Sequence, residues 1–162
     1  MDNLIIFSAK YVYVIEVILA IIYFFLQGRN KQKSIVALSI IFLPLAYILA
    51  QVIAAFYFDP RPFVVGHFTS LIPHAPDNGF PSDHMLLTSA IASILFVYNK
   101  KIGTLAWMIA IIVGISRVYA GIHHLTDIVG SATIAIVSIW IAERYILPQV
   151  AKTKLYKRYF EP

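Results

Sequence analysis

The segment SRVYAGIHHLTD, residues 116–127, places an arginine, two histidines and an aspartate between two strongly apolar stretches. His123 and Asp127 are four residues apart, so on a helix their side chains lie on one face. Asp127 would then accept a hydrogen bond from one ring nitrogen of His123 and leave the other nitrogen free to attack. The spacing predicts an oriented histidine nucleophile. Taken alone, however, a structural histidine beside a helix-capping acid is the commoner explanation.

Two arginines could serve the same chemistry. Arg61 lies in DPRP and Arg117 in the SR pair, and a guanidinium offers a planar donor fork that suits phosphate oxygens. The structural alternative is that both side chains snorkel to the lipid headgroups. Arg117 follows an apolar stretch with no other charge, and a charged group costs about 2.5–3.5 kcal/mol at the centre of a membrane helix. A functional role is therefore the default interpretation of Arg117.

A second histidine-bearing segment, FPSDH, occupies residues 80–84. Pro81, Ser82 and Asp83 are typical of a helix start, where free backbone N–H groups suit a phosphate. His84 would lie at the rim, where a protonated imidazole can donate to a leaving oxygen. An ordinary cap of a membrane helix explains the same residues without any chemistry.

A metal site is another interpretation of the histidines. His123, His124 and Asp127 are of metal-ligand types, but adjacent histidines point apart on a helix, so three well-placed ligands are hard to assemble. The chain has no cysteine, which excludes a thiolate nucleophile and cysteine-ligated zinc. We therefore expect neither a metal nor another cofactor.

Three other histidines and one glutamate are weaker candidates for chemistry. His67 and His74 lie in the long segment 63–80, which we interpret as a lid or headgroup-contacting loop. His124 is interpreted as a packing neighbour of His123. Glu16 lies within an apolar stretch, so its carboxyl group must face protein or water or carry a proton.

The elements that position these residues are expected to be membrane helices. Of the 162 residues, 60% are hydrophobic and only 13% charged, with a mean hydropathy of +0.79, far from the roughly 25% charged residues of soluble domains. A span needs about 20 apolar residues. The sequence predicts one all-α domain over residues 1–162, a polytopic bundle with a short interfacial helix at 3–9 and five spans at about 11–27, 34–57, 83–98, 103–118 and 126–147.

Charge predicts the direction of the spans. Nine of the thirteen Lys and Arg residues fall in the segments 28–33, 99–101 and 152–160. By the positive-inside rule these segments face the cytoplasm, which puts the N-terminus and all three chemistry-bearing segments outside. The net charge of +5 is thus a topology signal, and no nucleic-acid partner is expected.

Together the segments resemble the type 2 phosphatidic acid phosphatase superfamily of membrane lipid phosphatases, whose motifs are K-x6-R-P, P-S-G-H and S-R-x5-H-x3-D. The resemblance covers roughly residues 34–145. The third motif is complete, the first survives as Arg61-Pro62, and the second keeps its proline, serine and histidine. Ala54 stands where the lysine of the first motif would fall, and Asp83 where the glycine of the second would fall. With these departures the chain is similar to the bacterial undecaprenyl-diphosphatase branch of the bacitracin-resistance type.

The resemblance implies a role for each matching residue. His123 would be the nucleophile that forms a phosphohistidine, Asp127 would orient it, and His84 would protonate the leaving group and later activate water. The transferred phosphate would be held by Arg61, Ser82 and Arg117, and Pro81 is a candidate substrate contact. Asp83 has no counterpart in the generic motif and would either pair with an arginine or contact the second phosphate of a diphosphate.

The implied reaction is metal-independent hydrolysis of a polyprenyl diphosphate at the extracytoplasmic face of the cell membrane, which recycles a cell-wall carrier lipid. Phosphatidate and phosphatidylglycerophosphate are alternative substrates. An alternative of another class is a catalytically silent lipid-binding or transport protein on the same scaffold.

Overall fold

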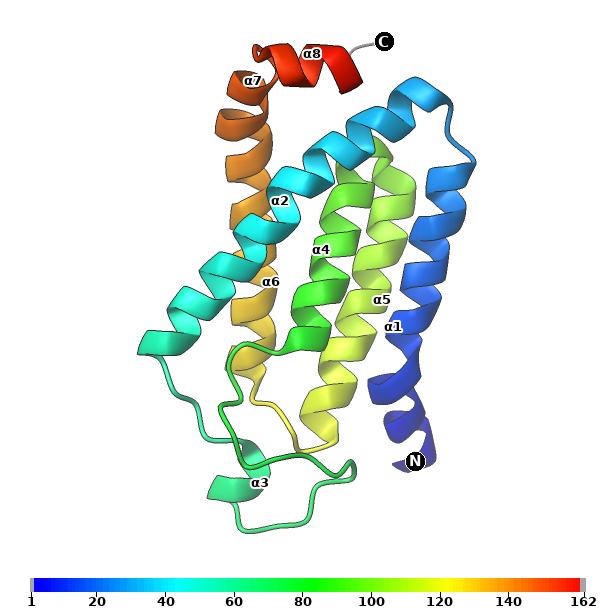
Figure 1. The fold of residues 1–162 in the computed structure, drawn as a ribbon. Helices are drawn as coiled ribbons and strands as arrows, with labels where there is room; N and C mark the ends of the chain where they lie inside the picture. The colour runs from blue at the N-terminus through cyan, green and yellow to red at the C-terminus, as the bar shows by residue number, and fades with distance from the viewer. Residues whose placement is uncertain (1, 161–162) are drawn as a thin grey trace.

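A computed structural model describes residues 2–160 and shows an all-helical bundle, which confirms the predicted fold class. Its long helices are α1 (Asp2–Phe25), α2 (Arg29–Phe56), α4 (Asp83–Tyr98), α5 (Lys100–Tyr119) and α6 (Leu125–Ile141). After α6 the chain continues through the π-helical turn η1 (Ala142–Ile146) into α7 (Leu147–Val150). Two short helices, α3 (Pro62–Val65) and α8 (Lys154–Phe160), lie at opposite ends of the bundle (Figure 1).

The expected spans are present with different boundaries. The prediction of a separate interfacial helix at 3–9 is wrong, because these residues form the first turns of α1. No glycine or proline interrupts Asp2–Phe25, so nothing stops the helix between the two predicted segments. For a similar reason α2 begins at Arg29, since the polar residues 29–33 are compatible with helix.

Within residues 2–160, four helical segments are long and apolar enough to cross a bilayer, namely α1, α2, α5 and the continuous stretch from Leu125 to Val150. Helix α4 has 16 residues, which at 1.5 Å per residue makes it about 24 Å long. It is the central helix of the bundle, in contact with α1, α2, α5 and α6. Protein therefore surrounds much of the shortest of the five long helices, whereas α1 exposes large apolar side chains such as Ile15, Ile18 and Ile22.

Small residues let the helices approach closely. The buried residues of α4 include Ala90, Ala92 and Ser93, and Gly103 of α5 lies against the backbone of Phe96, where a β-carbon would collide. Close approach of this kind is how membrane helices gain packing energy in the absence of a strong hydrophobic force between them. The α4–α5 hairpin is thereby a rigid base for the loops at its ends.

The connections divide between the two ends of the bundle. The N-terminus, the 57–82 connection and the 120–124 turn lie at one end, shown at the bottom of Figure 1. The α1–α2 turn, the α4–α5 turn and α8 lie at the other. The three segments predicted to carry chemistry thus share one end, and the basic segments share the opposite end.

Candidate active site

His123 and Asp127 are the centre of the site and are both buried, with exposures of 2% and 0%. His123 Nδ1 lies 3.2 Å from Asp127 Oδ2. The predicted contact is present, although His123 precedes helix α6 instead of lying within it. Asp127 is in the first turn of α6, and its Oδ2 also accepts the backbone N–H of His124 at 2.9 Å. This second bond fixes the carboxylate against the turn that carries His123.

The two arginines flank the other ring nitrogen. Arg61 Nη1 and Arg117 Nη2 each lie 3.4 Å from His123 Nε2. A guanidinium can only donate, so both contacts require an unprotonated Nε2. The proton of a neutral ring then resides on Nδ1 and is donated to Asp127. The site therefore selects the tautomer whose free lone pair points toward the two cations.

Burial lowers the pKa of His123, and the nearby Arg117 and Arg61 charges lower it further, whereas the hydrogen bond and charge of Asp127 act in the opposite direction. The net shift is downward from the ordinary value of 6.5. The imidazole consequently stays neutral at pH 7, as a nucleophile must.

Each arginine is held by a different part of the chain. Arg61 donates through Nε to Asp77 Oδ1 at 2.7 Å and through Nη1 to the carbonyl of Ile122 at 2.9 Å. Arg117, in the last turn of α5, donates through Nη1 to the carbonyl of Ala9 in α1 at 3.2 Å. Both side chains are 5% exposed, so they are not headgroup anchors. Two buried guanidinium groups that converge on one nitrogen have the charge and donor geometry that suit an anion.

The start of α4 is attached to the first turn of α6 through Ser131. The backbone N–H of Ser82 donates to Ser131 Oγ at 2.9 Å, and Ser131 Oγ donates to the carbonyl of Asp127 at 2.7 Å. The N–H of Ser82 is therefore occupied and does not serve a phosphate. Ser82 Oγ is fully buried and has no partner among the described residues, which leaves this hydroxyl available to a ligand.

The remaining residues of the FPSDH segment line the edge of the site. His84 is half-buried, and its ring packs edge-on against Tyr13 of α1 with the centroids 4.9 Å apart. Pro81 is half-buried, and Asp83 is exposed. Asp83 also lines a mainly apolar cavity of about 330 Å³ between α2 and α4.

The loop before α4 contributes residues that the sequence reasoning missed. Asp77 holds Arg61, and Asn78 Oδ1 accepts the backbone N–H groups of Asp59 and Phe80. Gly79 lies so close to Asp127 that a β-carbon would be 3.1 Å from Oδ2. The turn sequence PDNG, residues 76–79, was the available signal.

His74 is the one loop histidine placed beside the site, with its ring centroid 6.3 Å from that of His123. Partial burial and the charges of Arg61, Arg117 and His123 lower the pKa of His74, against an opposing effect of Asp77. The loop thus brings His74 close to His123 and the two arginines. Its interpretation as a lid or headgroup-contacting segment stays a prediction.

His124, His67 and Glu16 make no contact with His123 Nε2 among the hydrogen bonds described above. His124 Nε2 lies 3.0 Å from the carbonyl of Pro60, and His67 is exposed. Glu16 is fully buried in α1, and neither carboxyl oxygen has a partner within residues 2–160. The described residues contain no group of three His, Cys, Asp or Glu side chains suited to a metal ion.

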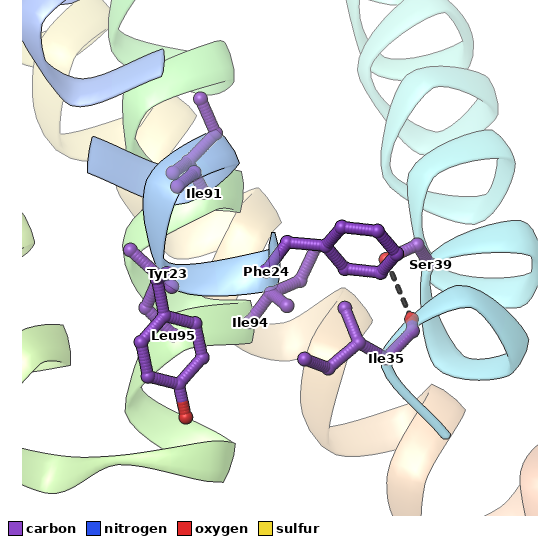
Figure 2. Close-up of a pocket in the computed structure, with 8 residues that line it drawn as sticks. Tyr23, Phe24, Ile35, Ser39, Ile91, Ile94 and Leu95 are labelled. Carbon is purple, nitrogen blue, oxygen red and sulfur yellow. Dashed lines mark hydrogen bonds between the residues drawn. The ribbon is translucent and has the colours of Figure 1, made fainter. Parts of the chain in front are cut away.

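A further cavity lies in the other half of the bundle. It measures about 120 Å³ and is lined by α1, α2 and α4 (Figure 2). Phe24, Ile91 and Ile94 are among its lining residues, and Ser39 Oγ donates a hydrogen bond to the carbonyl of Ile35. The lining is apolar and contains none of the histidines or arginines, so this cavity is not the reaction site.

Comparison with known proteins agrees with this geometry. Residues 32–150 match the model of the PAP2 superfamily. The chain belongs to the PAP2 superfamily. This confirms the resemblance seen in the motifs, and the protein is accordingly a phosphatase of that superfamily with several apolar helices that make it a multi-pass membrane protein.

Two curated proteins and one solved structure are similar to this chain. The chain is 31% identical over 137 residues to undecaprenyl-diphosphatase BcrC of Bacillus subtilis, covering 85% of this chain and 70% of the relative. It is 29% identical over 160 residues to the putative undecaprenyl-diphosphatase YbjG of Escherichia coli, covering 98% and 79%. Its fold is similar to the crystal structure of Aquifex aeolicus LpxE, with a TM-score of 0.69 and 26% identity over 89% of this chain and 86% of that one.

Proposed function

We propose that this PAP2 phosphatase hydrolyses a polyprenyl diphosphate, with undecaprenyl diphosphate as the principal substrate, to the monophosphate and inorganic phosphate. The observation that carries the proposal is the pair of buried guanidinium groups that converge on the free Nε2 of His123. An anion held by Arg61 and Arg117 would place its phosphorus within reach of that nitrogen. No residue in this arrangement requires a metal.

In the first step, Nε2 of His123 attacks the terminal phosphorus. The anhydride P–O bond breaks, its electron pair passes to the bridging oxygen, and His84 supplies the proton that releases the polyprenyl monophosphate. The phosphohistidine formed carries a positive ring, which the buried carboxylate of Asp127 stabilises through Nδ1–H.

In the second step, water attacks the phosphohistidine. His84 accepts the proton of that water, the N–P bond breaks, and its electron pair returns to Nε2. Inorganic phosphate departs, His123 is neutral again, and His84 carries the proton needed for the next cycle. Ser82 Oγ and the two guanidinium groups hold the three equatorial oxygens in both steps.

A long isoprenoid tail fits the groove that begins at Asp83. The cavity between α2 and α4 is lined beyond Asp83 by apolar side chains, among them Leu43, Leu86 and Leu87. Leu43 and Leu87 are exposed on the surface that faces lipid. A tail in this groove would bring its diphosphate to the first turn of α4, with Pro81 and Asp83 beside the proximal phosphate.

The names of the relatives support this substrate. One is an undecaprenyl-diphosphatase and another a putative undecaprenyl-diphosphatase, which suggests carrier-lipid recycling in cell-wall synthesis and a contribution to bacitracin resistance. With the basic end of the bundle in the cytoplasm, the N-terminus and the site would face outward and the C-terminus inward.

Phosphate release from undecaprenyl diphosphate in detergent with excess EDTA tests the proposal. We expect release by the native chain and none by His123→Ala. If phosphate is released only from phosphatidate or phosphatidylglycerophosphate, the proposed mechanism stands but the proposed substrate is wrong. Lipid binding without release from any lipid phosphate would favour the silent-scaffold alternative and overturn the proposal.

A further inference from the structure

The end of the bundle opposite the active site contains a second cationic cavity. It has a volume of about 410 Å³ and is lined by Arg29, Gln32, Lys33 and Val36 of α2 and by Phe160 of α8. These two elements are far apart in sequence, and the cavity exists only because α8 packs against the start of α2. Its lining is basic on one side and apolar on the other.

Helix α8 is amphipathic over its whole length. At 100° per residue, Lys154, Lys157 and Arg158 cover one side, and the apolar and aromatic residues Leu155, Tyr156, Tyr159 and Phe160 cover the other. Figure 1 shows α8 lying across the end of the bundle, at a steep angle to α6. A short basic amphipathic helix in this orientation matches one that lies in the membrane interface.

An apolar groove of about 150 Å³ adjoins the cationic cavity. It runs between α2 and α8 and is lined by Ala37, Ile40 and Ile41 on one side and by Tyr156 and Phe160 on the other. Phe160 lines both spaces. The two are therefore neighbours, and together they offer a cationic compartment for an anionic headgroup and an apolar compartment for a hydrocarbon chain.

Charge indicates which amphiphile fits. The segments 25–36, 97–103 and 142–160 contain ten Lys or Arg residues, namely Arg29, Lys31, Lys33, Lys100, Lys101, Arg144, Lys152, Lys154, Lys157 and Arg158, and a single acid, Glu143. Such a field attracts anionic headgroups. It also repels the same face of a second copy, which excludes self-association through this end as the occupant.

We propose that the cavity between α2 and α8 binds one anionic glycerophospholipid, with its phosphate at Arg29 and Lys33 and part of an acyl chain in the groove beneath α8. The bound lipid connects the C-terminal helix to the α1–α2 hairpin. The site lies at the opposite end from His123 and does not depend on which substrate the enzyme hydrolyses.

Native mass spectrometry of the full chain in detergent, with added phosphatidylglycerol or phosphatidylcholine, tests the site. We expect one phosphatidylglycerol to remain bound per chain, in clear preference to phosphatidylcholine. The variant Arg29→Gln/Lys33→Gln should weaken this binding by about tenfold or more, since each cation beside an anionic headgroup contributes about one factor of five.

Lys100→Gln/Lys101→Gln is the matched control, because it removes the same charge from the same end without touching the cavity. Its affinity should stay within about twofold of the native chain. Phe160→Ala provides an independent variant, which should lower phosphatidylglycerol retention while leaving all cations in place.

Three results would overturn the proposal. Equal losses in the two double variants would indicate a diffuse electrostatic effect. Equal retention of phosphatidylcholine would remove the charge argument, and competition by glycerol phosphate as strong as by the lipid would indicate a soluble anion site. None of these measurements uses catalysis, so they succeed or fail independently of the proposed reaction.

Discussion

Replacing Asp127 by asparagine tests the core of the proposed mechanism with a nearly isosteric change. Asp127 is fully buried, and its Oδ2 accepts from both His123 Nδ1 and the backbone of His124. The amide retains one acceptor oxygen but loses the charge that stabilises the positive phosphohistidine ring. Its NH2 group can also present a donor to Nδ1, which would favour the wrong tautomer of the histidine.

The structure sets the expected magnitude. Two unit charges about 4 Å apart interact by about 4 kcal/mol at an effective dielectric constant of about 20, and the contact at Nδ1 is 3.2 Å. A loss of this size corresponds to about 10³-fold in kcat. Because the charge matters mainly after the ring becomes positive, KM should change much less than kcat.

The assay is the initial rate of phosphate release from the diphosphate lipid at constant pH, with the thermal unfolding temperature measured alongside. Asp77→Asn is the matched control, since Asp77 is exposed where it pairs with Arg61. Arg61 itself is buried and keeps its bond to the carbonyl of Ile122. Because water screens the exposed carboxylate of Asp77, the control should lose less than about tenfold. A folded Asp127→Asn enzyme that keeps more than a tenth of native kcat would refute the assigned role, as would an equal loss in the control.

Three further predictions follow from individual contacts. Because the pKa of His123 is lowered and only the neutral ring attacks, the acidic limb of kcat/KM should have its midpoint below about 6.5; a midpoint above 7 in a pH–rate profile would contradict this. Ser131→Ala leaves the buried N–H of Ser82 without its acceptor, so thermal unfolding should show a loss of about 1–3 kcal/mol, together with a lower kcat because Asp127 loses its link to α4. Glu16→Leu removes a buried carboxyl group that has no partner among the described residues. The variant should be more stable by about 1–3 kcal/mol, with unchanged kcat. A destabilised, inactive variant would instead indicate that this carboxyl group takes part in the reaction.

Much of this protein could be predicted from local sequence. Apolar runs of span length separated by basic or polar turns predict membrane helices, because a bilayer leaves no other way to satisfy the backbone. The contact between His123 and Asp127 could also be predicted, because side chains four residues apart at the start of a helix lie close together. The boundaries were less accurate where the polar residues 29–33 and the mixed polar and apolar residues 2–10 continued a helix beyond the predicted span.

The tertiary structure decided what no local pattern contains. Arg61 reaches His123 across 62 positions, and Arg117 is fixed by the carbonyl of Ala9, 108 residues away. The positions of Asp77 and His74 depend on how the 63–80 loop folds back over the pocket, because no helical or strand periodicity constrains that loop. The cavity under α8 likewise arises where two distant helices pack. A short motif can specify which groups a site uses, but the distances between them are set by long-range packing, which one stretch of sequence does not encode.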